Sequence, residues 1–247
     1  MNCNFLVREV LHRTRAPFLR MDNKHKKLDN DLRRLINSFI LPLIMGAVLV
    51  ILHILVEFDF VNSRSWAVYP RSSQGAIGIF TAAFFHGDWE HLFSNLIPLV
   101  ILGAGIRFFY RMVSLSVILL SIIIPGLGVW LIGRSSYHLG ASGMVYSFVF
   151  FLFFSGVFRK DRVALVLSLL VAFGYGSVVW GILPIQEGVS WESHLVGAII
   201  GVLMAWIFKE VNRPPKRKEQ EDTPDYSGPF WNYKDLIPPP EGFEYPE

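Results

Sequence analysis

Residues 112–133 read MVSLSVILLSIIIPGLGVWLIG, a run of 22 residues without a charged side chain. A helix rises about 1.5 Å per residue and the apolar core of a bilayer is about 30 Å thick, so this run is typical of a transmembrane helix. Five further stretches share its apolar composition and lack of charge. They are Leu35–Val56, Leu92–Ile106, Ser135–Phe158, Val163–Gln186 and Ser193–Phe208. We therefore predict an all-α, multi-pass membrane protein with six transmembrane helices, the fourth preceded by a few residues of loop.

The composition places polar segments on both sides of this membrane domain. Of 247 residues, 52% are hydrophobic and 17% charged, and only 15 of the 43 charged residues lie between Leu35 and Phe208. We expect a basic cytoplasmic segment at residues 1–34, a membrane domain at 35–211 and a Pro-rich cytoplasmic tail at 212–247. This pattern excludes a disordered chain, a secreted disulfide-stapled module and a plain soluble enzyme.

The net charge of +3 does not indicate nucleic acid, because the basic residues adjoin apolar spans, where membrane topology explains them. Cys3 is the single cysteine, so neither a disulfide framework nor a thiolate metal site is expected. We expect no metal and no cofactor. The partners predicted at this stage are the lipid bilayer itself and membrane-protein substrates.

The positions of Lys and Arg predict the orientation of the spans. With the N-terminus in the cytoplasm, the segments on that side hold 20 of the 23 Lys and Arg, and only Arg64, Arg71 and Arg134 lie outside. The positive-inside rule therefore predicts that both termini are cytoplasmic. Residues 1–34 do not match a signal peptide, which favours direct insertion into a bacterial-type cell membrane, the inner membrane.

Polar side chains occur where three of the expected spans begin on the outer side. Counted from the cytoplasmic charge that anchors each helix, Ser142 lies at roughly 25 Å, His91 at roughly 24 Å and His194 at roughly 23 Å. Asn95 lies one turn deeper than His91. Ionisable groups inside a membrane are costly and point to function. These residues form one site if the three helices are neighbours.

The residue types at this depth suggest nucleophilic catalysis. A serine hydroxyl is a weak nucleophile until a base takes its proton. The histidines placed to take it from Ser142 are His194, His86 and His91, and His194 is the better candidate because it opens a helix at the depth of Ser142. His86, His91 and Asn95 are then candidate donors to an oxyanion, together with the Ser142 backbone N–H at a helix N-terminus. No Asp or Glu is expected inside the spans at this depth, which predicts a Ser–His dyad.

Several residues around the dyad are expected to support it. Gly140 and Gly143 let the chain turn into its helix and let a neighbour approach closely. Tyr146 lies one turn beyond Ser142, where its ring can pack on that of His194. Gly197 and Gly201 form a G-x-x-x-G face that brings the sixth span against the fourth, where plain close packing is the simplest role.

This ordered set of residues resembles the rhomboid family of intramembrane serine proteases. The resemblance rests on the spacing His86…His91…Asn95, the Gly140-Ala-Ser142-Gly143 motif with Tyr146, and His194 followed by Gly197 and Gly201, and it extends over about Leu35 to Phe208.

The resemblance implies a six-helix rhomboid-like bundle that cleaves single-span membrane proteins near the outer face. Ser142 would be the nucleophile, His194 the base, and His86, Asn95 and the Ser142 backbone the oxyanion contributors. There is one departure from the family pattern. Many members carry a Trp-Arg pair shortly before the first histidine, and Ile77-Gly78 stands there in this chain.

Other functions fit the sequence less well. A zinc protease needs two histidines four residues apart with Glu beside the first, whereas His86 and His91 are five apart and Glu90 precedes the second. A transporter would call for charges at mid-membrane or for paired broken helices. The main alternative is a catalytically inactive rhomboid-like protein that binds membrane clients, although such a protein would be expected to have lost the serine or the histidine.

Overall fold

The computed structural model describes residues 3–160, 162–174, 180–184 and 188–211, which belong to a single compact unit, Met1–Arg213. The second unit, Pro214–Glu247, which holds most of the expected Pro-rich tail, lies outside the described residues, as do parts of the fifth expected span. Within these ranges the chain is all-helical and has no β-strand, as the sequence predicts. Its seven α-helices are α1 (Cys3–Glu57), α2 (Gly78–Thr81), α3 (Trp89–Phe109), α4 (Ser114–Ile132), α5 (Ser142–Arg159), α6 (Arg162–Gly174) and α7 (Trp191–Ile207).

Four of these helices are long and apolar enough to cross a membrane: α3, α4, α5 and the Leu28–Glu57 part of α1. Helix α7 is also apolar but has only 17 residues, and the described part of α6 has 13. Helix α5 begins at Ser142 rather than Ser135, so the expected loop occupies the first seven residues of the predicted span. Many large apolar side chains on the helices are exposed, including Phe173 and Leu170, which fits a surface that faces lipid.

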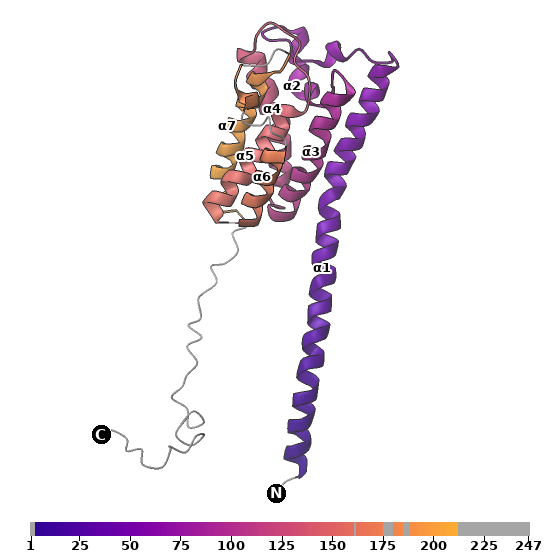
Figure 1. The fold of residues 1–247 in the computed structure, drawn as a ribbon, viewed down its shortest axis with the longest axis vertical. Helices are drawn as coiled ribbons and strands as arrows, with labels where there is room; N and C mark the ends of the chain where they lie inside the picture. Colours follow the sequence, from indigo (N-terminus) through magenta and orange to yellow (C-terminus); the bar gives the residue numbers. More distant parts are fainter. Residues whose placement is uncertain (1–2, 161, 175–179, 185–187, 212–247) are drawn as a thin grey trace, which may run out of the picture. The chain divides into compact units, whose positions relative to one another are not determined.

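Helix α5 makes the most extensive packing contacts of the bundle, with α3, α4, α6 and α7 (Figure 1). Its side chains Phe148, Phe151 and Leu152 are at most 1% exposed. Helix α1 packs on α3 and continues without a break from Cys3 to Glu57. The middle of the bundle is therefore a close-packed apolar core around α5.

The segment between α1 and α3, residues 58–88, is named the first outer segment after the side of the membrane that the charge distribution predicts for it. It is built from short turns, the 3₁₀ helices Ser63–Trp66, Gln74–Ala76 and Ala82–Phe84, and the single-turn helix α2. Arg71 fastens it to the end of α4, because its guanidinium donates to the carbonyl oxygens of Leu131 at 3.3 Å and Gly133 at 2.9 Å. In return, Trp130 donates from Nε1 to the Ser72 carbonyl at 3.0 Å. The two bonds from Arg71 satisfy carbonyl groups that the end of α4 leaves unpaired.

Gly78, one of the two residues at the place of the family's Trp-Arg pair, lies directly against backbone. A Cβ there would collide with the backbone of Ala67 and Val68. This close approach requires glycine at position 78. In this chain the segment is held by the backbone packing at Gly78 and by the hydrogen bonds of Arg71 and Trp130.

Candidate active site

Ser142 is the first residue of α5, and the chain turns sharply to bring it there. Gly140 has a φ of +118°, a conformation that L side chains rarely adopt. A Cβ on Gly140 would also lie 2.6 Å from Cε1 of His91. The Gly140 N–H donates to the Ala82 carbonyl at 2.9 Å, which ties the turn to the first outer segment. Glycine is therefore needed both for the turn and for the approach of the imidazole.

His194 lies in the first turns of α7 and is 7% exposed. Its Nδ1 lies 2.8 Å from the Gly181 carbonyl oxygen. Because a carbonyl oxygen only accepts, Nδ1 carries the hydrogen, and in the neutral ring Nε2 keeps a lone pair. The Tyr146 ring stacks on the imidazole, with centroids 4.1 Å apart and planes 8° from parallel. The ring is thus held in both orientation and tautomer.

A cavity of about 740 Å³ brings the expected site residues of three helices together. Its lining includes His91 and Asn95 from α3, Ser142 and Tyr146 from α5, and His194 from α7. Within the described residues, the hydrogen bonds do not include one between the Ser142 hydroxyl and the His194 ring. Catalytic hydrogen bonds are often long before substrate binds, so this arrangement is compatible with a nucleophile and its base.

The two histidines before Asn95 have different surroundings. His91 lines the cavity, and its backbone is fixed by the cap of α3, where its N–H donates to Asp88 Oδ1 at 2.7 Å. Asn95 donates from Nδ2 to the His91 carbonyl at 2.9 Å. His86 is fully buried and is absent from the lining of this cavity. The geometry thus brings His91 and Asn95, but not His86, to the wall that Ser142 shares.

His86 lies instead behind the loop that carries the serine. Its Nε2 accepts a hydrogen bond from the Ala141 N–H at 3.2 Å, and its ring meets the His91 ring edge-on at 5.0 Å. Burial, together with the neighbouring rings of His91 and His53, lowers the pKa of His86 to about 3. The ring is therefore neutral near pH 7, as an acceptor at Nε2 must be.

A family model of the rhomboid domain matches residues 73–211, which is more than half of the chain and includes Ser142, His194 and all their neighbours described above. The chain belongs to the rhomboid family. The resemblance noted in the sequence is thereby confirmed. The match and the apolar helices together make this chain an integral membrane protein of a family of intramembrane proteases.

Similar proteins occur in mycobacteria. Uncharacterised proteins of Mycobacterium bovis and Mycobacterium tuberculosis are 34% identical to it over 160 residues, which is 59% of this chain and 65% of theirs. An uncharacterised protein of Mycobacterium leprae is 35% identical over 159 residues, 59% of this chain and 61% of its own length. The chain thus spans less than two thirds of the length of these relatives.

In this rhomboid domain the glycines expected to pack helices do so by backbone contact. A Cβ on Gly197 would collide with the Gly143 carbonyl, and one on Gly201 would lie 2.5 Å from the Ser147 carbonyl. A Cβ on Gly143 would collide with Ser193 Oγ. Helices α5 and α7 therefore approach closely only because these positions lack side chains. The helix that carries Ser142 and the helix that carries His194 are in direct contact.

Sequence reasoning missed two features of the rhomboid site. The partner of His194 Nδ1 is a backbone carbonyl of Gly181, which no side-chain pattern reveals. Glu192 lies inside α7, which begins two residues earlier than the expected span, and its carboxylate accepts from the Arg134 backbone N–H at 3.2 Å. The described residues hold no group of three or more His, Cys, Asp or Glu side chains that could bind a metal ion.

Proposed function

We propose that this protein is an intramembrane serine endopeptidase that cleaves the membrane-spanning segments of single-span membrane proteins near the outer face of the bilayer. The observation that carries this proposal is the state of the His194 ring. Its Nδ1 donates to the Gly181 carbonyl at 2.8 Å, so Nε2 has a free lone pair, and the ring lines the same cavity as Ser142. A serine at a helix N-terminus that shares a cavity with such a base can act with it as the nucleophile and general base of a serine hydrolase.

The reaction uses the two side chains as nucleophile and general base. Nε2 of His194 takes the proton of the Ser142 hydroxyl while Oγ attacks the carbonyl carbon of the scissile peptide bond. The imidazolium then gives that proton to the leaving nitrogen, the C–N bond breaks, and the acyl group remains on Ser142. Nε2 of His194 then deprotonates a water that attacks the acyl carbon, the bond from that carbon to Ser142 Oγ breaks, and the imidazolium returns its proton to Oγ. The Gly181 carbonyl stabilises the imidazolium through Nδ1–H, in the position that a carboxylate occupies in a triad.

The oxyanion of the tetrahedral intermediate needs donors on the cavity wall. The Ser142 N–H at the start of α5 supplies one, aided by the positive end of the helix dipole. Asn95 and His91 line the same wall, which supports them as the side-chain donors. His86 was expected in this role from the sequence, but its hydrogen bond to the Ala141 N–H supports a different one. We assign it to holding the loop before Ser142, residues 133–141, which we call the serine loop.

The topology that suits this function has six spans, with both termini in the cytoplasm. In this proposal residues 1–34 form a basic cytoplasmic segment, 35–211 the membrane domain and 212–247 a cytoplasmic tail, and the protein resides in a bacterial cell membrane. The support comes from the distribution of Lys and Arg and from four helices of spanning length. Ser142 and His194 then lie a few ångströms below the outer surface, where water reaches them.

Cleavage by the reconstituted protein tests the function. The full chain is placed in liposomes with single-span test substrates and compared with Ser142→Ala and with Ser155→Ala, a buried serine further along α5 that serves as the matched control. We expect cleavage by the wild type and the control, and none by Ser142→Ala. A serine-directed fluorophosphonate should label the same two proteins.

The outcomes separate the two functions considered from the sequence. Equal cleavage by Ser142→Ala would show that another residue is the nucleophile. Binding of test substrates without cleavage or labelling by any variant would favour an inactive rhomboid-like protein that binds membrane clients.

A further inference from the structure

Two polar contacts join the loop before Ser142 to the start of α7, and the mechanism above uses neither. They are the hydrogen bond between His138 and Ser190 and the pairing of Arg134 with Glu192, and we call them together the outer clasp. His138 precedes Ser142 by four residues, and Ser190 precedes His194 by four. The clasp thus connects the two chain segments that lead directly into the proposed dyad.

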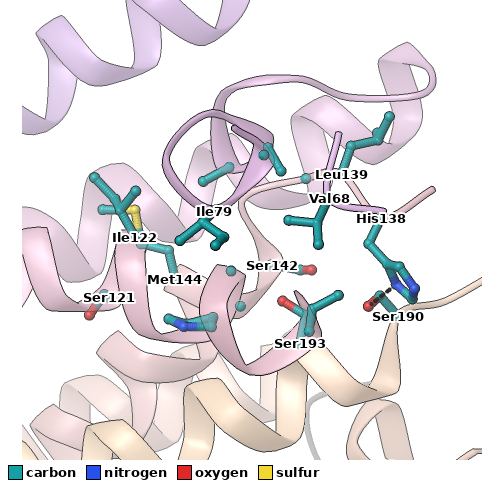
Figure 2. A pocket seen from close by; sticks show the side chains of 18 residues that line it. Val68, Ile79, Ser121, Ile122, His138, Leu139, Ser142, Met144, Ser190 and Ser193 are labelled. Atoms are coloured by element: carbon teal, nitrogen blue, oxygen red, sulfur yellow. Dashed lines mark hydrogen bonds between the residues drawn. The ribbon is translucent and has the colours of Figure 1, made fainter. Parts of the chain in front are cut away.

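The His138 side chain is a buried link with a defined hydrogen-bond pattern. Its Nδ1 lies 2.7 Å from Ser190 Oγ, a bond that Figure 2 shows as a dashed line. Its Nε2 lies 3.0 Å from the Arg134 carbonyl oxygen. The carbonyl only accepts, so Nε2 carries the hydrogen, and in that tautomer Nδ1 accepts a hydrogen bond from the Ser190 hydroxyl. The ring is only 5% exposed, so water competes little for this bond.

Ser190 uses its hydroxyl in an unusual way for its position. It is the N-cap of α7, where a serine oxygen ordinarily accepts from an N–H in the first turn of its own helix. Within residues 188–211 the Ser190 side chain makes no such capping bond. Its hydroxyl is directed to His138 instead, so the start of α7 is held by the serine loop rather than by a cap of its own.

Arg134 and Glu192 make the second half of the clasp. Glu192 Oε1 accepts from the Arg134 backbone N–H at 3.2 Å and lies 3.8 Å from Arg134 Nε. The Arg134 guanidinium also donates to the Val189 carbonyl. Glu192 is 2% exposed, and a buried carboxylate is costly unless it is paired. Loop and helix therefore hold each other at two points.

The clasp also reaches the first outer segment. The backbones of His138 and Val68 pair in both directions. The Val68 nitrogen lies 2.9 Å from the His138 oxygen, and the His138 nitrogen lies 2.8 Å from the Val68 oxygen. His138 is therefore the residue at which the first outer segment, the serine loop and α7 meet. His138 and Ser190 also line the cavity that Ser142 and His194 share, but the mechanism proposed above gives neither of them a role.

We propose that the outer clasp sets the separation and orientation of Ser142 and His194, with His138 and Ser190 as positioning residues. This inference rests on the proposed function, because it assigns the clasp to the same site. A misplacement of about 1 Å at a catalytic pair costs up to about 100-fold in rate. The clasp therefore matters for turnover more than for binding.

The test removes or retains one hydroxyl in the full chain reconstituted in liposomes. Ser190→Ala deletes the bond to His138, Ser190→Thr keeps a hydroxyl, and Ser38→Ala removes a buried hydroxyl that bonds within its own helix. We expect Ser190→Ala to lower kcat and the rate of fluorophosphonate labelling about 10- to 100-fold, with KM changed less than about twofold. Ser190→Thr should recover most of the loss, and Ser38→Ala should behave as the wild type.

Amide hydrogen exchange supplies a readout that does not depend on activity. In Ser190→Ala, exchange should be faster within residues 134–145 and 189–197 and unchanged elsewhere, and Ser190→Thr should restore the wild-type pattern. The proposal would be overturned if Ser190→Ala kept both the kcat and the exchange pattern of the wild type. It would also be overturned if Ser190→Ala and Ser190→Thr lost kcat equally and both had a lowered thermal midpoint.

Failure of the proposed function gives a different result. If the wild type neither cleaves nor labels, the assignment as a protease fails, and exchange alone decides the clasp. Faster exchange of Ser190→Ala within residues 134–145 and 189–197 alone then supports the clasp as the link between these segments. Unchanged exchange overturns the clasp.

Discussion

The two ends of α5 use their polar groups differently. At the Ser142 end, a cavity of about 740 Å³ interrupts the packing and is lined by polar side chains from three helices. At the Arg159 end, the guanidinium donates to the Phe208 carbonyl and lies 4.6 Å from the Tyr110 ring centroid, so it bonds two neighbouring segments. Between the ends, Phe151 and its neighbours are closely packed. Under the proposed function, the Ser142 end therefore serves the reaction and the rest of the helix serves stability.

The largest effect that tests this comparison comes from His194→Ala. Without the base, the Ser142 hydroxyl keeps its proton, and we expect cleavage to fall by about 10⁴-fold or more. Fluorophosphonate labelling of Ser142 should be lost with it. The thermal midpoint should fall only modestly, because the variant loses the stacking on Tyr146 and the hydrogen bond to Gly181 but no apolar side chain of the core.

A variant that keeps its activity but melts earlier would break the comparison, since His194 would then belong to the stabilising part of the molecule. Rates at saturating substrate and melting curves, measured on the same preparation, separate the two results.

The second prediction concerns the other region. Phe151 is fully buried and meets the Tyr110 ring edge-on at 5.3 Å, so Phe151→Ala should lower the free energy of unfolding by about 3–5 kcal/mol. The kcat of the folded fraction should be unchanged. Unfolding in mixed micelles measures the first quantity. Leu115→Ala, at a side chain that is 55% exposed on α4, is the control and should change stability little.

The helices were predictable because apolar, charge-free stretches are long and end at charges. The expected spans 92–106 and 112–133 correspond to α3 and α4, with ends that differ by one to three residues. Counting depth from cytoplasmic charges placed Ser142, His91 and His194 on one level, and the three side chains line one cavity. Such counting works because a helix has a constant rise per residue.

What could not be predicted depends on loops and backbone. Which of two nearby histidines faces the cavity follows from the turn between His86 and α3, and no periodic pattern describes that turn. The partner of His194 is a backbone carbonyl of Gly181, which every residue type supplies equally. The His138–Ser190 bond joins residues 52 apart in the chain through two loops, and histidine and serine at those positions are ordinary when read singly.

We call the residues around the cavity at the Ser142 end of α5 the reactive region. Asn95→Ala tests how far this region extends into α3. Loss of one oxyanion donor lowers kcat by about 100- to 1,000-fold in serine hydrolases, and we expect a decrease of that order with little change in KM. His91→Ala should also lower kcat. His86→Ala should instead lower the thermal midpoint, because it leaves the Ala141 N–H without its buried acceptor.

Steady-state rates and melting curves of the three variants distinguish these roles. If His86→Ala lowered kcat as much as Asn95→Ala while leaving stability intact, His86 would have to act on the oxyanion, and the boundary of the reactive region would lie behind the serine loop.

The smallest effects should locate the boundary between the two regions along the contact of α5 with α7. A Cβ on Gly197 would collide with the Gly143 carbonyl, next to Ser142, whereas one on Gly201 would meet the Ser147 carbonyl a turn further on. Both Gly197→Ala and Gly201→Ala should lower the free energy of unfolding by about 1–3 kcal/mol, because each forces the helices apart. Only Gly197→Ala should also lower kcat, since it displaces the start of α5 relative to His194. Equal loss of kcat in both variants would mean that the reactive region extends at least one turn deeper into the packed half of α5 than the cavity indicates.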